Sequence, residues 1–266
     1  MSRKKTIWLW AFSIIFTIGV AYLQRITGPS YPLKSKVSIN NIVIKSKLPR
    51  SSDAENGELI KIIVHDKSVT GEFKYKRFKS YDTLTTVPMT RDGDTLTAII
   101  PKQPPAGKVM YMITLISGNS KVALTDDYVI LRYTGNVPEY ILFLHIIIIF
   151  LAMLYSTRAG VEAMYKGIKT YRYAFIAMVT LFIGGLILGP VVQKYAFNAY
   201  WTGWPFGQDL TDNKTLVAFI FWAIAFFRLS RNKNNFKWAI IAAIVLLIIF
   251  LIPHSMLGSE IDYTVK

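Results

Sequence analysis

Residues 140–155 read YILFLHIIIIFLAMLY, and this stretch decides the fold. It contains no Lys, Arg, Asp or Glu, and four consecutive isoleucines lie at its centre. A helix needs about 20 mostly apolar residues to cross the hydrocarbon core of a bilayer. The run therefore predicts a membrane-spanning helix.

Four further apolar runs occupy residues 7–23, 173–192, 216–229 and 238–252. The first two reach spanning length directly, and the last two reach it if their polar ends lie in the membrane interface. The first run follows three basic residues and has no small-residue cleavage site after it, so we expect an uncleaved signal anchor over 1–25. The sequence thus predicts a membrane protein with five transmembrane α-helices.

Residues 26–138 have a different pattern, in which apolar residues alternate with polar ones as they do in β-strands. Val109, Tyr111 and Ile113 are one example. Asp92-Gly93 and Gly118-Asn119 are hairpin signals, because glycine supplies the positive φ of a tight turn. We expect an all-β sandwich of the immunoglobulin or fibronectin type between the first two helices. The chain has no cysteine, which fits the fibronectin-like variety better.

The chain carries a formal charge of +15 and is 52% apolar. The apolar content excludes a disordered protein. Eleven Lys and Arg residues and one acid, Glu162, lie in the segments before the first helix, between the second and third, and between the fourth and fifth. The positive-inside rule assigns these segments to the cytoplasm. The β domain and the C-terminus are then outside. This division argues against nucleic acid as a partner and favours anionic lipid headgroups.

The domain from 139 to 266 contains four of the helices and an outer loop, 193–214, that is rich in aromatic residues. Trp201, Trp204 and Phe206 lie in this loop. One interpretation is an aromatic belt, since Trp and Tyr rings settle at the level of the headgroups. The other is a lid whose rings stack on a planar ligand such as a quinone or a porphyrin.

Two carboxylates, Asp209 and Asp212, follow the aromatic residues. Asp212 or Asn213 is placed to cap the fourth helix, where a carboxylate also interacts favourably with the helix dipole. The alternative is a cation site with oxygen ligands, completed by Glu260 or Asp262 from the C-terminal tail.

Three features inside the helices carry further hypotheses. His145 and His254 are both expected in the outer half of the membrane, where they are candidate haem ligands. The alternative for His145 is a hydrogen bond between helices. Arg158 and Glu162 have the spacing of an i,i+4 ion pair on a helix. Gly184-Gly185 is typical of close helix packing.

The segments 24–32, 201–214 and 253–262 resemble those of bacterial multi-pass inner-membrane proteins that carry a fibronectin-like periplasmic domain after the first helix. The resemblance covers the whole chain and implies a bacterial inner membrane. The positive-inside rule, applied to such a membrane, places the N-terminus in the cytoplasm and the β domain and the C-terminus in the periplasm. The resemblance implies no activity.

No nucleotide-binding loop, HExxH or GxSxG motif is present in the sequence, so we expect a protein that is not an enzyme. The first functional hypothesis is a β domain that binds or positions a membrane or periplasmic protein partner. The alternatives are a haem- or quinone-binding redox protein and a subunit for passage of small solutes or ions. Passage through five helices would require a homo-oligomer.

Overall fold

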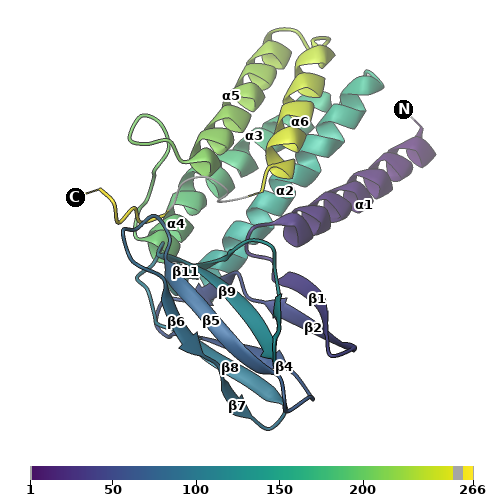
Figure 1. Cartoon of the computed structure of the whole chain (residues 1–266). Coiled ribbons are helices and arrows are strands. Elements are labelled where there is room, and N and C mark those ends of the chain that lie inside the picture. The colour runs from purple at the N-terminus through teal and green to yellow at the C-terminus, as the bar shows by residue number, and fades with distance from the viewer. Residues whose placement is uncertain (1, 254–259, 266) are drawn as a thin grey trace. The chain divides into compact units, whose positions relative to one another are not determined.

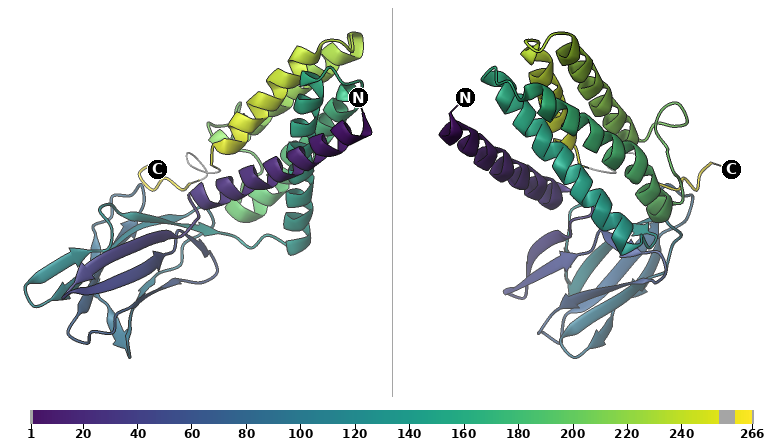
Figure 2. Two further views of the ribbon diagram at one scale, coloured as in Figure 1. Left: turned by 90° about the vertical axis from the view of Figure 1, so that its right-hand side faces the viewer. Right: turned by 180° about the vertical axis from the view of Figure 1, so that it is seen from behind.

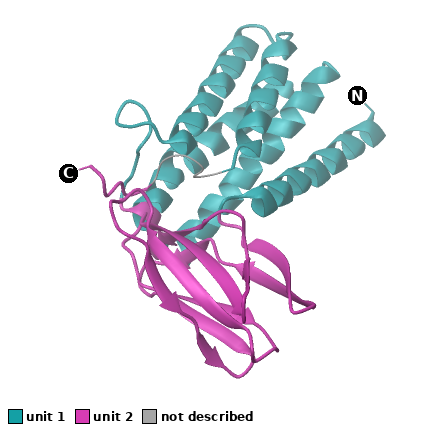
Figure 3. Cartoon of the chain, viewed as in Figure 1, with its two compact units in different colours: residues 1–29, 137–195, 199–258 teal, residues 30–136, 196–198, 259–266 magenta. Residues whose placement is uncertain are grey.

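The computed structural model describes residues 2–253 and 260–265 of the chain (Figure 1). The chain divides into two compact units, which Figure 3 shows in different colours. A helical unit contains residues 1–29, 137–195 and 199–258, and a β unit contains residues 30–136, 196–198 and 259–266. The sequence placed 196–198 and the C-terminal tail in the helical domain, whereas the structure groups both with the strands.

Within the described residues, the helical unit consists of five helical rods. They are α1 (Arg3–Thr27), α2 (Glu139–Met164), the continuous rod α3–η1–α4 (Thr170–Leu181, Phe182–Leu188, Gly189–Phe197), α5 (Leu210–Arg231) and α6 (Phe236–Leu251). Each apolar run predicted from the sequence forms one of these rods. The two views in Figure 2 show α1, in purple, beside α2, and the two helices are in contact.

Four rods are long and apolar enough to cross a membrane: α1, α2, α3–η1–α4 and α5 have 25, 26, 28 and 22 residues. The chain is therefore a multi-pass membrane protein. Helix α6 has 16 residues. At about 1.5 Å per residue it is about 24 Å long, less than the hydrocarbon core of about 30 Å. Its length alone does not make it a fifth span.

Small residues let the helices approach one another closely, as is usual in membrane bundles. The buried alanines of the bundle are Ala152, Ala159, Ala163, Ala174, Ala177, Ala218, Ala225, Ala239 and Ala242. A Cβ on Gly160 of α2 would lie 2.6 Å from the Cβ of Ala243 in α6. Helix α6 therefore packs against α2 at a distance that only glycine permits.

The segment η1 is a π-helix in which Gly184 and Gly185 are buried. A Cβ on Gly185 would lie 2.7 Å from Cγ2 of Thr215 in α5, and one on Gly184 would lie 3.0 Å from Ile148 in α2. The expectation that these glycines permit close helix packing is confirmed.

The described part of the β unit has eleven strands, which Figure 1 labels where there is room. They are β1 (Leu33–Ile39), β2 (Ile42–Leu48), β3 (Ser51–Asp53), β4 (Glu58–Ile63), β5 (Thr70–Arg77), β6 (Thr85–Pro88), β7 (Thr90–Asp92), β8 (Thr95–Ile100), β9 (Lys108–Ser117), β10 (Ser120–Ala123) and β11 (Val129–Thr134). One sheet has the order β3-β11-β9-β5-β6, with β10 also paired to β9. A second has the order β4-β8-β7, and β1 and β2 form a hairpin.

The strands share one hydrophobic core, to which both sheets and the hairpin contribute. Ile44 of β2, Ile60 of β4, Phe73 of β5 and Tyr111 of β9 are all buried in it. The alternation seen in the sequence thus directs one side of each strand into the core. The prediction of a β-rich domain between the first helix and the remaining helices is confirmed.

Both predicted hairpin turns are present. Gly93 joins β7 to β8 with a φ of 56°, and Gly118 joins β9 to β10 with a φ of 54°. The hairpin of β1 and β2 turns at Asn40 and Asn41, which have φ values of 52° and 60°. Asparagine is the residue other than glycine that tolerates this conformation best.

Replacing Gly160 with alanine should push α6 away from α2, since the added methyl group would overlap Ala243. We expect a loss of about 1–3 kcal/mol, typical of overpacking, in the free energy of unfolding. Gly19→Ala in α1 is the matched control, because nothing lies within 4 Å of its added Cβ. Thermal unfolding of the two purified variants in detergent measures the difference. Equal midpoints would contradict this packing of α6.

Candidate functional site

The outer loop is held by a buried carboxylate, Asp212, which is only 6% exposed. Its Oδ2 accepts hydrogen bonds from the backbone N–H groups of Thr202 and Gly203, at 2.6 Å and 3.0 Å. The side chains of Thr202 and Gln193 donate to the same oxygen at 3.2 Å. One carboxylate oxygen therefore anchors the loop to both α4 and α5.

Two neighbouring residues complete this anchor. A Cβ on Gly203 would lie 2.6 Å from the Cβ of Asp212, so the loop can approach the carboxylate only with glycine there. Asn213 Oδ1 accepts from the Trp204 N–H at 2.6 Å. Helix α5 begins at Leu210, earlier than expected, and Asp209 is its N-cap. The cap therefore falls on Asp209 rather than on Asp212 or Asn213.

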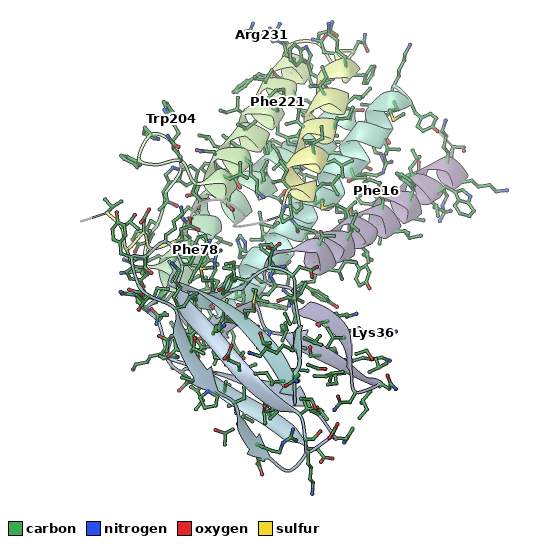
Figure 4. The ribbon with its side chains drawn as sticks, in the orientation of Figure 1. Phe16, Lys36, Phe78, Trp204, Phe221 and Arg231 are labelled. Carbon is green, nitrogen blue, oxygen red and sulfur yellow. The ribbon has the colours of Figure 1, made fainter. Side chains whose placement is uncertain are left out.

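The aromatic residues of the loop differ in exposure. Trp204 and Phe206 are 69% and 84% exposed, and Figure 4 shows Trp204 on a loop that projects beside α5. Trp201 is half-buried, and its Nε1 donates to the Trp204 carbonyl at 3.1 Å. Rings exposed in this way suit the headgroup region of a bilayer.

His145 makes a hydrogen bond between helices. Its Nδ1 lies 3.0 Å from the carbonyl oxygen of Gly184 in η1, so Nδ1 carries the proton that is donated. His254, the other candidate haem ligand, lies outside the described residues. Within the described ranges, no group of three His, Cys, Asp or Glu residues is placed to hold a metal ion.

Glu260 is engaged within the β unit. Its carboxylate pairs with the ammonium groups of Lys79 and Lys108. The tail around it is bound as well, because the N–H of Ile261 donates to the carbonyl of Ala106 at 3.2 Å. The N–H of Tyr263 donates to the carbonyl of Lys79 at 2.9 Å. Both oxygens of Glu260 therefore face cations of the protein.

The charges in this cluster influence one another. Burial raises the pKa of Glu260, but the hydrogen bonds and charges of Lys108 and Lys79 outweigh it, so the net pKa is lowered. Burial and the nearby charge of Arg132 lower the pKa of Lys108, although Glu260 opposes them. The cluster was missed from the sequence, because Glu260 and Lys108 are 152 positions apart.

The predicted pair of Arg158 and Glu162 is confirmed, with Nη2 and Oε2 2.6 Å apart, but it is buried. The two side chains are 0% and 1% exposed. The guanidinium carbon lies 5.4 Å from the ring centroid of Trp10 and 4.8 Å from that of Tyr173. This pair therefore belongs to the interior of the bundle, where aromatic rings surround its cation.

A dense set of lysines covers the exposed side of the β1–β2 hairpin. Lys34 lies directly opposite Lys47, and Lys36 lies directly opposite Lys45. These four lysines line a hollow of 580 Å³, and Lys61 of β4 lines it as well. We call these five residues the lysine face, and Figure 4 labels one of them, Lys36, on the β1–β2 hairpin. No member has an ion-pair partner among residues 2–253 and 260–265.

The lysine face could have been predicted from the sequence, because lysines occupy every second position in parts of two adjacent strands. Such spacing puts them on one side of the sheet. Aliphatic side chains lie beside them on β4 and β8. Leu59, Ile63 and Ile99 are 45%, 60% and 65% exposed, and Leu59 is paired with Ile99. The lysine face thus combines unpaired positive charge with apolar surface.

No protein-family model, curated protein or solved structure matches this chain.

Asp212→Asn should loosen the outer loop, since a neutral amide oxygen accepts the four hydrogen bonds made to Oδ2 more weakly than a carboxylate oxygen does. We expect faster proteolysis between residues 198 and 209 and a loss of about 1–3 kcal/mol in stability. Limited proteolysis followed by mass spectrometry measures the cleavage rate. The control is Asp126→Asn, on an exposed loop of the β unit. An unchanged rate at Asp212→Asn would show that the carboxylate does not hold the loop.

Acid should release the tail from the β unit. The folded pKa of Glu260 is below its ordinary value of 4.5, so the ionised carboxylate favours the bound tail. This contribution is fully present above pH of about 4.5 and is lost as the pH falls through the lowered pKa. A dye on Val265→Cys, the only cysteine of that variant, reports tail mobility by anisotropy. With Glu260→Gln added, the acid transition should vanish; its persistence would rule out Glu260 as the group responsible.

Proposed function

We propose that the chain is a non-enzymatic membrane protein whose β unit binds an acidic surface of a protein partner through the lysine face. The observation that carries this proposal is the pairing of Lys34 with Lys47 and of Lys36 with Lys45 across two strands. Like charges directly opposite one another destabilise a sheet. A negatively charged partner would remove that repulsion.

The composition of the surface supports a protein as the partner. Leu59, Ile63 and Ile99 offer exposed aliphatic area beside the lysines, as the apolar centre of a protein interface requires. The side chains lining the hollow include no aromatic ring on which a nucleic acid base could stack. Ser46 also lines it, and its buried Oγ has no hydrogen-bond partner among the described residues.

We propose five membrane crossings, with the N-terminus in the cytoplasm and the β unit in the bacterial periplasm. Contacts inside the β unit support this, because the tail after α6 is bound to residues of the β unit that precede α2. Because the tail and these residues of the β unit are bound to each other, they lie on the same side of the membrane in this proposal. An even number of crossings then separates the β unit from the tail. Helices α2, α3–η1–α4, α5 and α6 supply four, so the short α6 also crosses.

The end of α6 is suited to such a crossing. Gln24 donates to the carbonyl of Phe250 at 2.8 Å, and Lys214 Nζ donates to the carbonyl of Ile252 at 2.6 Å. These bonds satisfy carbonyl groups that have no partner within the helix, which the membrane requires of any backbone it contains.

The three basic segments meet at the other end of the helical unit. Lys5 Nζ lies 3.6 Å from the ring centroid of Tyr165, and Lys233 Nζ lies 5.4 Å from that of Tyr171. This supports a common cytoplasmic side. The two-layer core also supports the immunoglobulin- or fibronectin-like assignment as part of the proposal.

The alternative functions have less support. The haem and quinone hypotheses depend on His145, His254 and the aromatic residues 201–206, and the solute-passage hypothesis depends on Asp209, Asp212 and Glu260. Polar atoms of His145, Asp212 and Glu260 are engaged within the protein. We therefore favour the binding function.

Lys36→Glu should stabilise the protein while weakening its binding. The change replaces a repulsive pair with an attractive one, worth about 0.2–1 kcal/mol in the free energy of unfolding. Thermal unfolding of the full chain in neutral detergent measures that gain. A labelled peptide of alternating Glu and Leu serves as the binding probe in fluorescence polarisation. A loss of stability would contradict the described register of the hairpin.

The decisive comparison uses two double variants of the full chain. Lys36→Glu/Lys45→Glu should weaken peptide binding at least tenfold, whereas Lys67→Glu/Lys102→Glu, exposed elsewhere on the β unit, should leave it near the wild-type value. A photo-crosslinker at Ile63 in cells should give a protein adduct that the first variant loses and the second keeps. Equal binding by both variants would overturn the proposed function.

A further inference from the structure

The basic end of the helical unit contains a cavity of 460 Å³. It lies between the start of α1 and the connection from α2 to α3. Lys5 and Thr6 of α1 line one side, and Lys166 and Lys169 line the other. The cavity is separate from the lysine face, which belongs to the β unit.

The cavity has an excess of positive charge. Glu162 is the only acid that lines it, and its Oε2 is already paired with Arg158. The three lysines have no ion-pair partner in the described ranges. The first turn of α1 contains no acidic residue, although the positive end of a helix dipole favours one. An anion would complete this arrangement.

Lys166 has a conformation that normally belongs to glycine. Its φ is 51°, at the residue after the C-cap of α2. The Lys166 N–H donates to the carbonyl of Ala163 and the Gly167 N–H donates to that of Glu162, as in a Schellman motif. Glycine is the usual residue there because a side chain is strained. The chain thus has a lysine at a position where it weakens the fold.

The buried ion pair of Arg158 with Glu162, which lines the cavity, adds a second observation. Arg158 is 0% exposed, and its Nε and Nη1 have no hydrogen-bond acceptor among the described residues. Because Glu162 is paired with the guanidinium of Arg158, it does not neutralise the lysines that line the cavity. The Oε1 of Glu162 lies against Gly167, where a Cβ would come within 2.1 Å of it. The cavity lining is therefore tightly packed where Glu162 meets Gly167.

We propose that this cavity binds a phosphate group. Lysine ammonium groups are common phosphate ligands. The dipole of α1 adds positive charge at this end, although the N–H groups of Lys5 and Thr6 already donate to Ser2. Ile168 also lines the cavity and is 93% exposed, and Tyr165, another lining residue, is 53% exposed. Apolar residues at the rim of a cationic cavity match an anionic phospholipid, with its headgroup phosphate among the lysines. A soluble phosphate compound shares the same recognising chemistry.

Native mass spectrometry of the full chain in neutral detergent tests the proposal, with phosphatidylglycerol, phosphatidylcholine or inorganic phosphate added. We expect phosphatidylglycerol to be retained in preference to phosphatidylcholine. Lys5→Gln and Lys169→Gln should each lower its occupancy about fivefold. Lys233→Gln, at the same end but outside the cavity, should leave it unchanged. Binding of inorganic phosphate with the same dependence on the lysines would support a soluble ligand instead.

Lys166→Gly keeps the test interpretable if other variants fold poorly. It should raise thermal stability, because glycine relieves the positive φ, while lowering phosphate or lipid occupancy about fivefold. Occupancy that is the same in the wild type, Lys166→Gly and Lys5→Gln would overturn the proposal. So would the absence of both phosphatidylglycerol preference and phosphate binding in the wild type.

Discussion

The ion pairs that Glu260 forms with Lys79 and Lys108 are the interaction on which the proposed arrangement in the membrane depends. They join the C-terminal tail to residues of the β unit that precede α2, and the number of crossings that we propose between these two segments is therefore even. In the proposed arrangement, helix α6 crosses the membrane despite its 16 residues. Gln24 and Lys214 donate hydrogen bonds to the carbonyl groups of Phe250 and Ile252. These backbone groups at and just beyond the end of α6 therefore have partners.

The +15 charge of the chain has two distinct roles in this account. At the basic end of the helical unit, which we propose to be cytoplasmic, lysines line a cavity suited to phosphate. On the β unit, Lys36, Lys45 and their neighbours repel one another, and an acidic protein would relieve that repulsion. The lysines of the cavity and those of the lysine face both lower the stability of the protein when they have no partner, as functional surfaces often do.

The sequence predicted the helices because each apolar run is continuous, and it predicted the turns at Gly93 and Gly118 because glycine is required there. It did not predict the start of α5 at Leu210, since its first turn is polar and lies outside the apolar run. Glu260 and Lys108 could not be paired from the sequence, because only the folded β unit brings them together. The spacing of Arg158 and Glu162 predicted their pairing, but their burial depends on Trp10 of another helix.

The central claim is that the β unit and the C-terminus share one side of the membrane, opposite the basic connections. The chain has no cysteine, so single cysteines can be labelled without background. Asn119→Cys, Val265→Cys and Asn234→Cys place exposed thiols in the β unit, the tail and the α5–α6 connection. A membrane-impermeant maleimide should label the first two in cells with a permeable outer membrane, and the third only after lysis. Labelling of Asn119→Cys without Val265→Cys, or of Asn234→Cys before lysis, would contradict the account.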